Sequence, residues 1–390
     1  MKKWKKIRSC ARMAVLVCWI LAAGSAWSLK ASGAETEEMF QFQQEILDGI
    51  GLSDMDEAMR DILGEEPVSL ESWVLMLLEG KLPLTKETLQ KRIQDSLYGA
   101  WSQQKKTAGY VFGLAVSSCA FSGFVGILAK SQAAKMAVSM LYFLMITVLV
   151  QVTAGFSGTA EETVGKMMSF LQILMPTYLA VSVMAKGSLG SAAFYELMLG
   201  ALGMLQSLLR YVVIPLADLY LLTALLGNLS EKNRFSRMSE LLKQAVDWSL
   251  KTIIVFVAGL QTVQNLILPA VDAFQRSLLT KAGSAIPAVG GLFGSVTELF
   301  FGSAALIRSA LGAAGLLLLA LICMTPLIYL GVGALVYQVL GAILQPVVDE
   351  RMSACFTAAG ESIWMLFKAV AVTAMLLFMS LALTSVSLGG

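Results

Sequence analysis

Long apolar runs dominate the sequence from residue 109 onward. They are 17 to 25 residues long, and a helix of that length covers the roughly 30 Å of hydrocarbon in a bilayer. The stretches 284–301 and 331–344 are also apolar, and their pattern leaves open whether they cross. The pattern predicts an all-α, polytopic helical membrane protein. About eight spans are predicted, at 109–128, 136–156, 170–186, 189–208, 211–229, 250–271, 309–330 and 362–386.

Residues 1–34 have the pattern of a secretory signal peptide. Six basic residues precede a short apolar run at 13–24, which is too short to span a bilayer comfortably. Cleavage after Ala26 or after Ala34 would each leave small residues at the processing site. An uncleaved anchor is the alternative, and it gives the same orientation to the segment that follows.

Residues 35–105 form a small acidic segment of soluble composition. Between residues 35 and 95 there are 15 acidic and 5 basic residues, which gives a local net charge of 5 − 15 = −10. Short amphipathic helices are predicted, with a break at Gly80 and Pro83 and with Thr85 as an N-cap. Because a signal peptide precedes it, the segment is predicted to be extracytoplasmic. Its acidic face is either a solvated surface or a docking surface for partner domains.

Basic residues give a direction to the membrane domain, residues 106–390. If residue 109 lies outside, the internal connections carry eight Lys and Arg residues, whereas the outer connections up to residue 271 carry only Lys166 and Arg210. The internal loop at 230–249 has the pattern of a basic amphipathic helix. We expect it to lie on the cytoplasmic membrane surface, with contact to a cytoplasmic partner as the alternative. Its apolar face contains Leu241, Leu242, Ala245 and Trp248.

Composition narrows the possible functions further. Apolar residues make up 57% of the chain and charged residues 14%, and the net charge of +2 gives no reason to expect a nucleic-acid partner. The chain has no histidine, which excludes Ser-His-Asp triads and imidazole-based metal sites. A stretch at 158–167 resembles a phosphate loop, but six residues separate its glycines where four are required. No catalytic, cofactor-binding or metal-ligating residues are therefore predicted, and the protein is not expected to be an enzyme.

Ionisable residues at membrane depth are candidates for function, because a charge in hydrocarbon costs roughly 3 kcal/mol or more. Glu196 and Asp218 lie in successive predicted spans, and an antiparallel pair of helices would place both toward one interior. Glu298 and Lys368 also qualify. An interfacial position with a snorkelling side chain is the alternative for both of them.

A possible internal repeat links the middle and the end of the chain. Gly-Ser-Ala-Ala occurs at 190–193 and 302–305, and each copy is followed at the same spacing by a glycine-containing element, at 199–203 and 311–315. Chance recurrence of small residues is the alternative. A true repeat is inverted if residues 284–301 dip into the membrane and parallel if they cross it. The flanking prolines are Pro176, Pro215, Pro287 and Pro326.

Two segments carry a resemblance to a known family. LQILMPTYLAVSVMAKGSLGSAAFYE at 171–196 and AIPAVGGLFGSVTELFFGSAALIRSALGAAGLLLLALICMTPLIYL at 285–330 resemble the stage III sporulation protein AE family. The likeness covers nearly the whole chain, and Ile-Pro-x-Val-Gly-Gly at 286–291 is its most specific part. Within it, Pro287, Gly290 and Gly291 predict a break or re-entrant turn rather than a straight span. These three are candidate pore or packing positions, together with Glu196, Asp218 and Glu298.

The resemblance implies an integral protein of the mother-cell membrane that surrounds the forespore, the outer forespore membrane. Such a protein would be a subunit of a channel or secretion-like apparatus that joins mother cell and forespore. Its partners would be the lipid bilayer, ring-forming subunits and a cytoplasmic ATPase. The alternative, based on the possible repeat and the two carboxylates, is a self-sufficient secondary transporter of a small solute.

Overall fold

The computed structural model describes residues 55–56, 59, 62, 69–128, 132–186, 189–229, 235–283 and 293–386. In this part of the chain every regular element is a helix, so the predicted all-α fold is confirmed. Five described segments are long and apolar enough to cross a membrane. The elements are α4 (Leu70–Leu78), α5 (Lys86–Leu128), α6 (Gln132–Lys186), α7 (Leu189–Leu208), η1 (Leu209–Val213), α8 (Ile214–Leu229), α9 (Ser236–Gly283), α10 (Phe293–Leu344) and α11 (Glu350–Val386).

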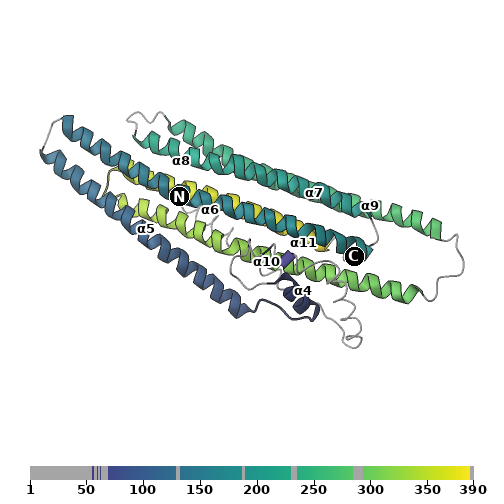
Figure 1. The fold of residues 1–390 in the computed structure, drawn as a ribbon. Helices are drawn as coiled ribbons and strands as arrows, with labels where there is room; N and C mark the ends of the chain where they lie inside the picture. The colour runs from purple at the N-terminus through teal and green to yellow at the C-terminus, as the bar shows by residue number, and fades with distance from the viewer. Residues whose placement is uncertain are drawn as a thin grey trace.

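The long helices lie side by side in an elongated bundle (Figure 1). They alternate in direction, so that α5, α8 and α10 end where α6, α9 and α11 begin (Figure 1). Helix α11 lies at the centre, in contact with α6, α8, α9 and α10, and it is the most buried of the five candidate spans. The core therefore forms around an apolar helix that neighbours cover on several sides.

Local sequence explains the short helix α4. Ser69 caps its N-terminus by accepting a hydrogen bond from the Ser72 backbone N–H, and Asp56 accepts hydrogen bonds from Ser69 and from the Leu70 backbone N–H. Gly80 ends it with a φ of 73°, a left-handed conformation that glycine adopts without strain. The break predicted at Gly80 is thus confirmed, and α4 packs against α10.

Helix α6 corrects the prediction of a reversal between residues 156 and 170. The spans predicted at 136–156 and 170–186 are two parts of one continuous helix of 55 residues. The polar segment between them contains no proline and no paired glycines. The Lys166 ammonium lies 2.8 Å from the Glu162 carboxylate four residues earlier, and such a pair supports a helix.

The reversal predicted between residues 208 and 211 is also wrong. Helices α7 and α8 are joined by η1, a five-residue π-helix, into one continuous helical segment. The Ile214 N–H bonds to the Leu209 carbonyl five residues earlier. Pro215 follows immediately, and a proline ring in a helix clashes with the carbonyl four residues before it. The wider turn of η1 accommodates that proline without ending the helix.

The predicted surface helix at 230–249 is not a separate element. Residues 236–249 are helical, but they continue without a break into the rest of α9 and pack against α8 and α11. Leu241 and Trp248, two members of the predicted apolar face, are exposed, whereas Val246 and Leu250 are buried. The amphipathic pattern is real, but it directs a different face of the helix toward the bundle.

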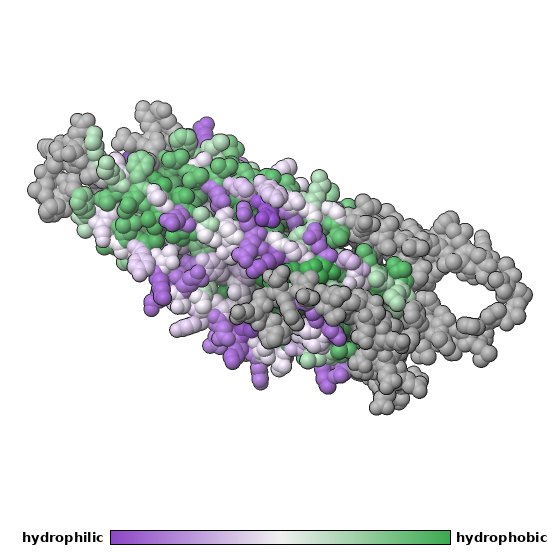
Figure 2. All heavy atoms as spheres, viewed as in Figure 1, coloured by the Kyte–Doolittle hydropathy of each residue, from purple (hydrophilic) through white to green (hydrophobic). Residues whose placement is uncertain are grey.

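Helix length bears on the number of membrane crossings. At 1.5 Å per residue, α6 is about 80 Å long, more than twice the thickness of the hydrocarbon core. The exposed apolar residues Met136 and Met140 lie near its start, whereas the exposed side chain of Glu162 lies in its middle. Figure 2 shows the same division, with hydrophobic residues near the α5–α6 end of the bundle and hydrophilic residues in the middle of this face. The predicted count of about eight crossings included the two reversals that these continuous helices lack, and the number of crossings itself stays a prediction.

Candidate functional site

Five polar and charged side chains meet between α8, α9 and α11. We call them the interhelical cluster: Tyr220 from α8, Lys243 and Asp247 from α9, and Glu361 and Lys368 from α11. All lie in segments apolar enough to span a membrane. Charges in such segments require partners, because unpaired charges are costly in hydrocarbon.

The cluster consists of two linked sets of contacts. The Lys243 ammonium lies 2.5 Å from Glu361 Oε2, and the Tyr220 hydroxyl donates a 2.8 Å hydrogen bond to the same oxygen. One turn along α9, Asp247 Oδ1 accepts a 2.7 Å hydrogen bond from the Lys368 ammonium. The side chains of the two ion pairs are between 22% and 37% exposed, so water screens them only in part.

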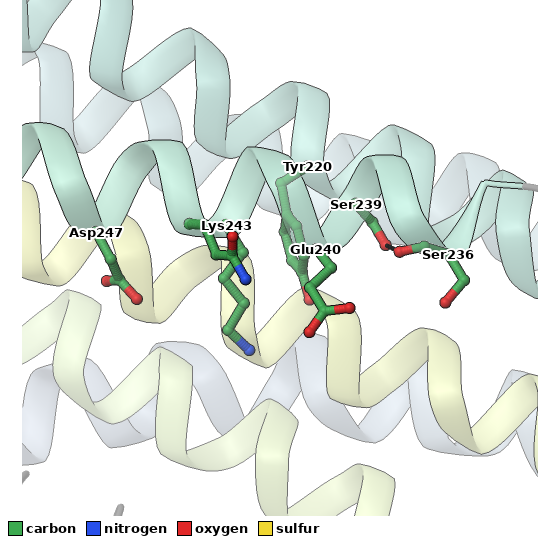
Figure 3. A pocket seen from close by; sticks show the side chains of 7 residues that line it. Tyr220, Ser236, Ser239, Glu240, Lys243 and Asp247 are labelled. Atoms are coloured by element: carbon green, nitrogen blue, oxygen red, sulfur yellow. Dashed lines mark hydrogen bonds between the residues drawn. The ribbon is translucent and has the colours of Figure 1, made fainter.

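A pocket of about 430 Å³ opens beside the cluster. Figure 3 shows Glu240, Lys243 and Asp247 extending from the same side of α9, with Tyr220 behind them. Residues 236, 240, 243 and 247 are three or four apart, and this spacing places them on one face of a helix. The pocket lining is Tyr220, Ser236, Ser239, Glu240, Lys243, Gln244 and Asp247.

Asp218 makes a separate contact on the other side of α8. Its Oδ2 accepts a 2.7 Å hydrogen bond from the Ser157 hydroxyl on α6. Its neighbour Ala217 accepts a 3.0 Å hydrogen bond from the buried Ser362 hydroxyl of α11 through its backbone carbonyl. Helix α8 is therefore held to α6 and to α11 by polar contacts, and the functional role of Asp218 stays a prediction.

The expectation that Glu196 and Asp218 lie on an antiparallel pair of helices is wrong. Both lie on the continuous α7–η1–α8 segment, 22 residues apart, which corresponds to about 33 Å along a helix. The backbone of Glu196 lies in α7 and that of Glu298 in α10, but their side chains are outside the described part. Pro287, Gly290 and Gly291 lie outside the described residues altogether, so their roles stay predictions.

Lys368 has a partner that its sequence context does not reveal. Instead of snorkelling, its ammonium bonds to Asp247, and its side chain is 25% exposed. The sequence also gives little prior reason to select Tyr220, Lys243 or Glu361. One signal was available: Lys243 and Asp247 are four residues apart, so they share a face of the amphipathic part of α9.

The two copies of the possible repeat lie in parallel helices. A methyl group at Gly203 of α7 would lie 2.9 Å from Met168 Cε of α6. A methyl group at Gly315 of α10 would lie 2.7 Å from Leu174 Cδ2, also of α6. Gly333 of α10 packs on Phe156, earlier in α6. Helix α10 therefore runs antiparallel to α6, as α7 does (Figure 1). This is the arrangement expected of a parallel repeat.

Comparisons with known proteins cover almost the same residues as the described helices. The family model for stage III sporulation protein AE matches residues 68–387. The chain is similar to stage III sporulation protein AE of Bacillus subtilis (strain 168), with 22% identity over 378 residues, which covers 94% of this chain and 95% of the relative. No solved structure matches the chain.

Proposed function

Because the chain belongs to the stage III sporulation protein AE family, we propose that it is a non-enzymatic membrane subunit of a channel or secretion-like apparatus joining mother cell and forespore. Its role in sporulation and its membrane-spanning character follow from the family and from the five apolar helices. The family match over residues 68–387 is the observation that carries the proposal, because it includes α4 and nearly all of the helical bundle.

The contacts in the bundle support a structural subunit rather than an enzyme. The described charges of the interhelical cluster bond to one another across α8, α9 and α11. A catalytic site instead directs a nucleophile, a base and an oxyanion donor toward one reacting atom. Side chains whose hydrogen bonds are made between helices stabilise an arrangement of helices.

Basic residues support the proposed orientation, with the N-terminal segment extracytoplasmic. The α5–α6, α8–α9 and α10–α11 connections share one end of the bundle (Figure 1). The continuous helices α6 and α7–η1–α8 replace two predicted reversals, so the chain crosses two times fewer before residue 229. Because an even number of crossings is removed, the α8–α9 connection stays on its predicted cytoplasmic side. The six basic residues in or next to these connections are Lys130, Lys135, Lys232, Arg234, Arg237 and Arg351, whereas only Lys186, Arg276 and Lys281 flank the α6–α7 and α9–α10 connections.

The position of α4 fits the same orientation. The Thr177 hydroxyl donates a hydrogen bond to Met55 Sδ, which links the N-terminal segment to the last turns of α6. In the proposed orientation this end of the bundle faces the space between the two membranes around the forespore. Ring-forming subunits would contact the acidic segment there, and a cytoplasmic ATPase would contact the α8–α9 end. The membrane itself would be the mother-cell membrane around the forespore.

Affinity purification from sporulating cells tests the proposal. After extraction in a mild detergent, we expect the tagged chain to retain the ring-forming subunits and the ATPase in fixed ratios. The Asn233→Asp variant is a control, because it adds a negative charge among the basic residues of the α8–α9 connection. The same partners should co-purify with it if their binding does not depend on simple charge attraction there. Recovery of the chain alone, monodisperse and without those subunits, would contradict the proposal.

The second candidate is a self-sufficient secondary transporter. The charged pocket lined by α8 and α9 favours it, as does the parallel direction of α7 and α10, which contain the two copies of the possible repeat. A transporter of this kind would purify without partners, and its substrate would raise its thermal unfolding temperature through preferential binding to the folded state. The same purification therefore separates the two candidates.

A further inference from the structure

The two ion pairs of the interhelical cluster have opposite polarity. Along α9 the order is Lys243 and then Asp247, whereas along α11 it is Glu361 and then Lys368. Both helices begin at the same end of the bundle and run in the same direction (Figure 1). Each helix therefore presents one positive and one negative charge, in an order complementary to that of the other.

We propose that these four residues position α9 on α11 by setting its register, and that the ion pairs act as a latch for this helix. The most apolar part of the spanning segment of α9 is only 28% buried, as it is in α6, compared with 67% for α11. Apolar packing that is so incomplete discriminates weakly between neighbouring registers. Buried polar groups specify register in other helical assemblies at some cost in stability.

Sliding α9 by one turn toward its N-terminus places like charges close together, and sliding it the other way pulls one opposite pair apart. Lys243 and Asp247 are about 6 Å apart along α9, and Glu361 and Lys368 about 10 Å apart along α11. A shift of about 5 Å toward the α9 N-terminus brings Asp247 level with Glu361 and leaves Lys368 without its partner. A shift in the other direction keeps Asp247 level with Lys368, but it moves Lys243 about 5 Å along the axis away from Glu361 and toward Lys368. Only the observed register pairs all four charges.

Tyr220 extends the latch to a third helix. Its hydroxyl donates to the same Glu361 oxygen that Lys243 contacts, so the α11 carboxylate lies between α8 and α9. A carboxylate accepts several hydrogen bonds at once, whereas a neutral amide in its place would lose the charge that attracts Lys243. Glu361 is therefore the central positioning residue of the cluster.

Reversal of the charges tests the proposal. Lys243→Glu and Glu361→Lys, each alone, should lower the yield of heat-resistant spores by about tenfold or more, because each juxtaposes like charges in a partly buried site. The combined K243E/D247K/E361K/K368D variant reverses all four charges, so it restores both attractive pairs and their opposite order in the same register. We expect it to recover spore yield to within about threefold of the unchanged protein. The amount of protein in the membrane is measured in the same cells. If the single variants reduce this amount, its recovery in the combined variant supports the proposal as well.

Two further variants distinguish a role in fixing the register of α9 from the mere pairing of charges that would otherwise be unpaired. Replacing Lys243, Asp247, Glu361 and Lys368 together by leucine or methionine removes all charges, and we expect that variant to reach the membrane but not to restore sporulation. Full activity would overturn the proposal, because the charges would then serve only to satisfy one another. The exposed pair Glu162–Lys166 is the control, and its reversal should have no effect. Normal sporulation in both single variants, or no recovery in the combined one, would also overturn the proposal.

Discussion

At the scale of single residues, the contact between α10 and α11 depends on missing side chains. A methyl group at Gly360 would lie 2.8 Å from Gln338 Cγ and 2.9 Å from the Gln338 backbone nitrogen. A methyl group at Gly341 would lie 2.8 Å from the Thr357 hydroxyl oxygen. Small residues allow helices in a bilayer to approach closely enough for backbone contact. These two glycines therefore bring α10 against the central helix.

Gly360→Ala should destabilise the bundle, because the Gln338 backbone cannot rotate away as a side-chain tip can. We expect a loss of about 1–3 kcal/mol, measured as a lower thermal unfolding temperature in detergent. Gly302→Ala on α10 is the control, since a methyl group there meets no neighbour within 4 Å. Equal unfolding temperatures for both variants would show that α10 and α11 are less closely packed than described.

The distance between Glu196 and Asp218 sharpens the prediction for these carboxylates. Glu196→Gln and Asp218→Asn each remove a charge while keeping most hydrogen-bonding capacity, so insertion should be unaffected. Both changes should impair sporulation. Because the residues lie about 33 Å apart on one helical segment, their effects should be additive in free energy, so that the fold-reductions multiply in the double variant. Spore yields of both single variants and the double variant provide the measurement, and an unchanged yield in the double variant would mean that the carboxylates are incidental.

Local sequence identifies single charged positions in apolar segments but not the pairs that they form. The cost of a buried charge identified Asp218 and Lys368 from hydropathy alone. Their partners, Ser157 and Asp247, depend on which helix packs against which, and local sequence does not encode this choice. Lys243 lies in the basic amphipathic segment that the pattern assigns to the membrane surface, so local sequence does not mark it as a site residue.

At the scale of elements, the continuity of α6 reverses the predicted side of its C-terminus. Eight crossings place Lys186 in the cytoplasm, whereas a continuous α6 that starts there places it outside. In a cysteine-free background, Ala185→Cys should therefore react with an impermeant thiol reagent added from the extracytoplasmic side. Met136→Cys, near the start of α6, is the control and should remain unlabelled. Protection of both positions from outside would favour two crossings within residues 132–186.

The elements themselves were easier to predict than their junctions. Apolar runs identify segments such as 309–330 and 362–386, which lie within α10 and α11. The dip in hydropathy between residues 156 and 170 was interpreted as a loop, although it contains none of the proline or paired-glycine signals that break helices. Polar residues with good helix propensity continue a helix as readily as apolar ones do. Hydropathy therefore locates apolar segments but does not show whether two of them form one helix.

At the scale of the whole molecule, the bundle is longer than a bilayer is thick. Exposed apolar side chains gather near the α5–α6 end, and exposed charges lie farther along the same face (Figure 2). An apolar surface is stable in lipid, and an exposed ion pair is stable in water or among headgroups. We therefore expect the bilayer to surround the end of the bundle that contains Met140 and Phe143, with the middle of α6 outside the hydrocarbon.

The last prediction concerns orientation, on which the proposed partners depend. A cysteine at Glu57, in the acidic segment, should react with an impermeant thiol reagent from the extracytoplasmic side, and one at Asn233 should react only after the membrane is permeabilised. The bias of basic residues toward the α8–α9 end supports this direction, because lysine and arginine are retained in the cytoplasm during insertion. Both substitutions lie in polar segments, so they should not disturb the bundle. The reverse labelling pattern would place the acidic segment in the cytoplasm, and ring-forming subunits in the intermembrane space could then no longer reach it.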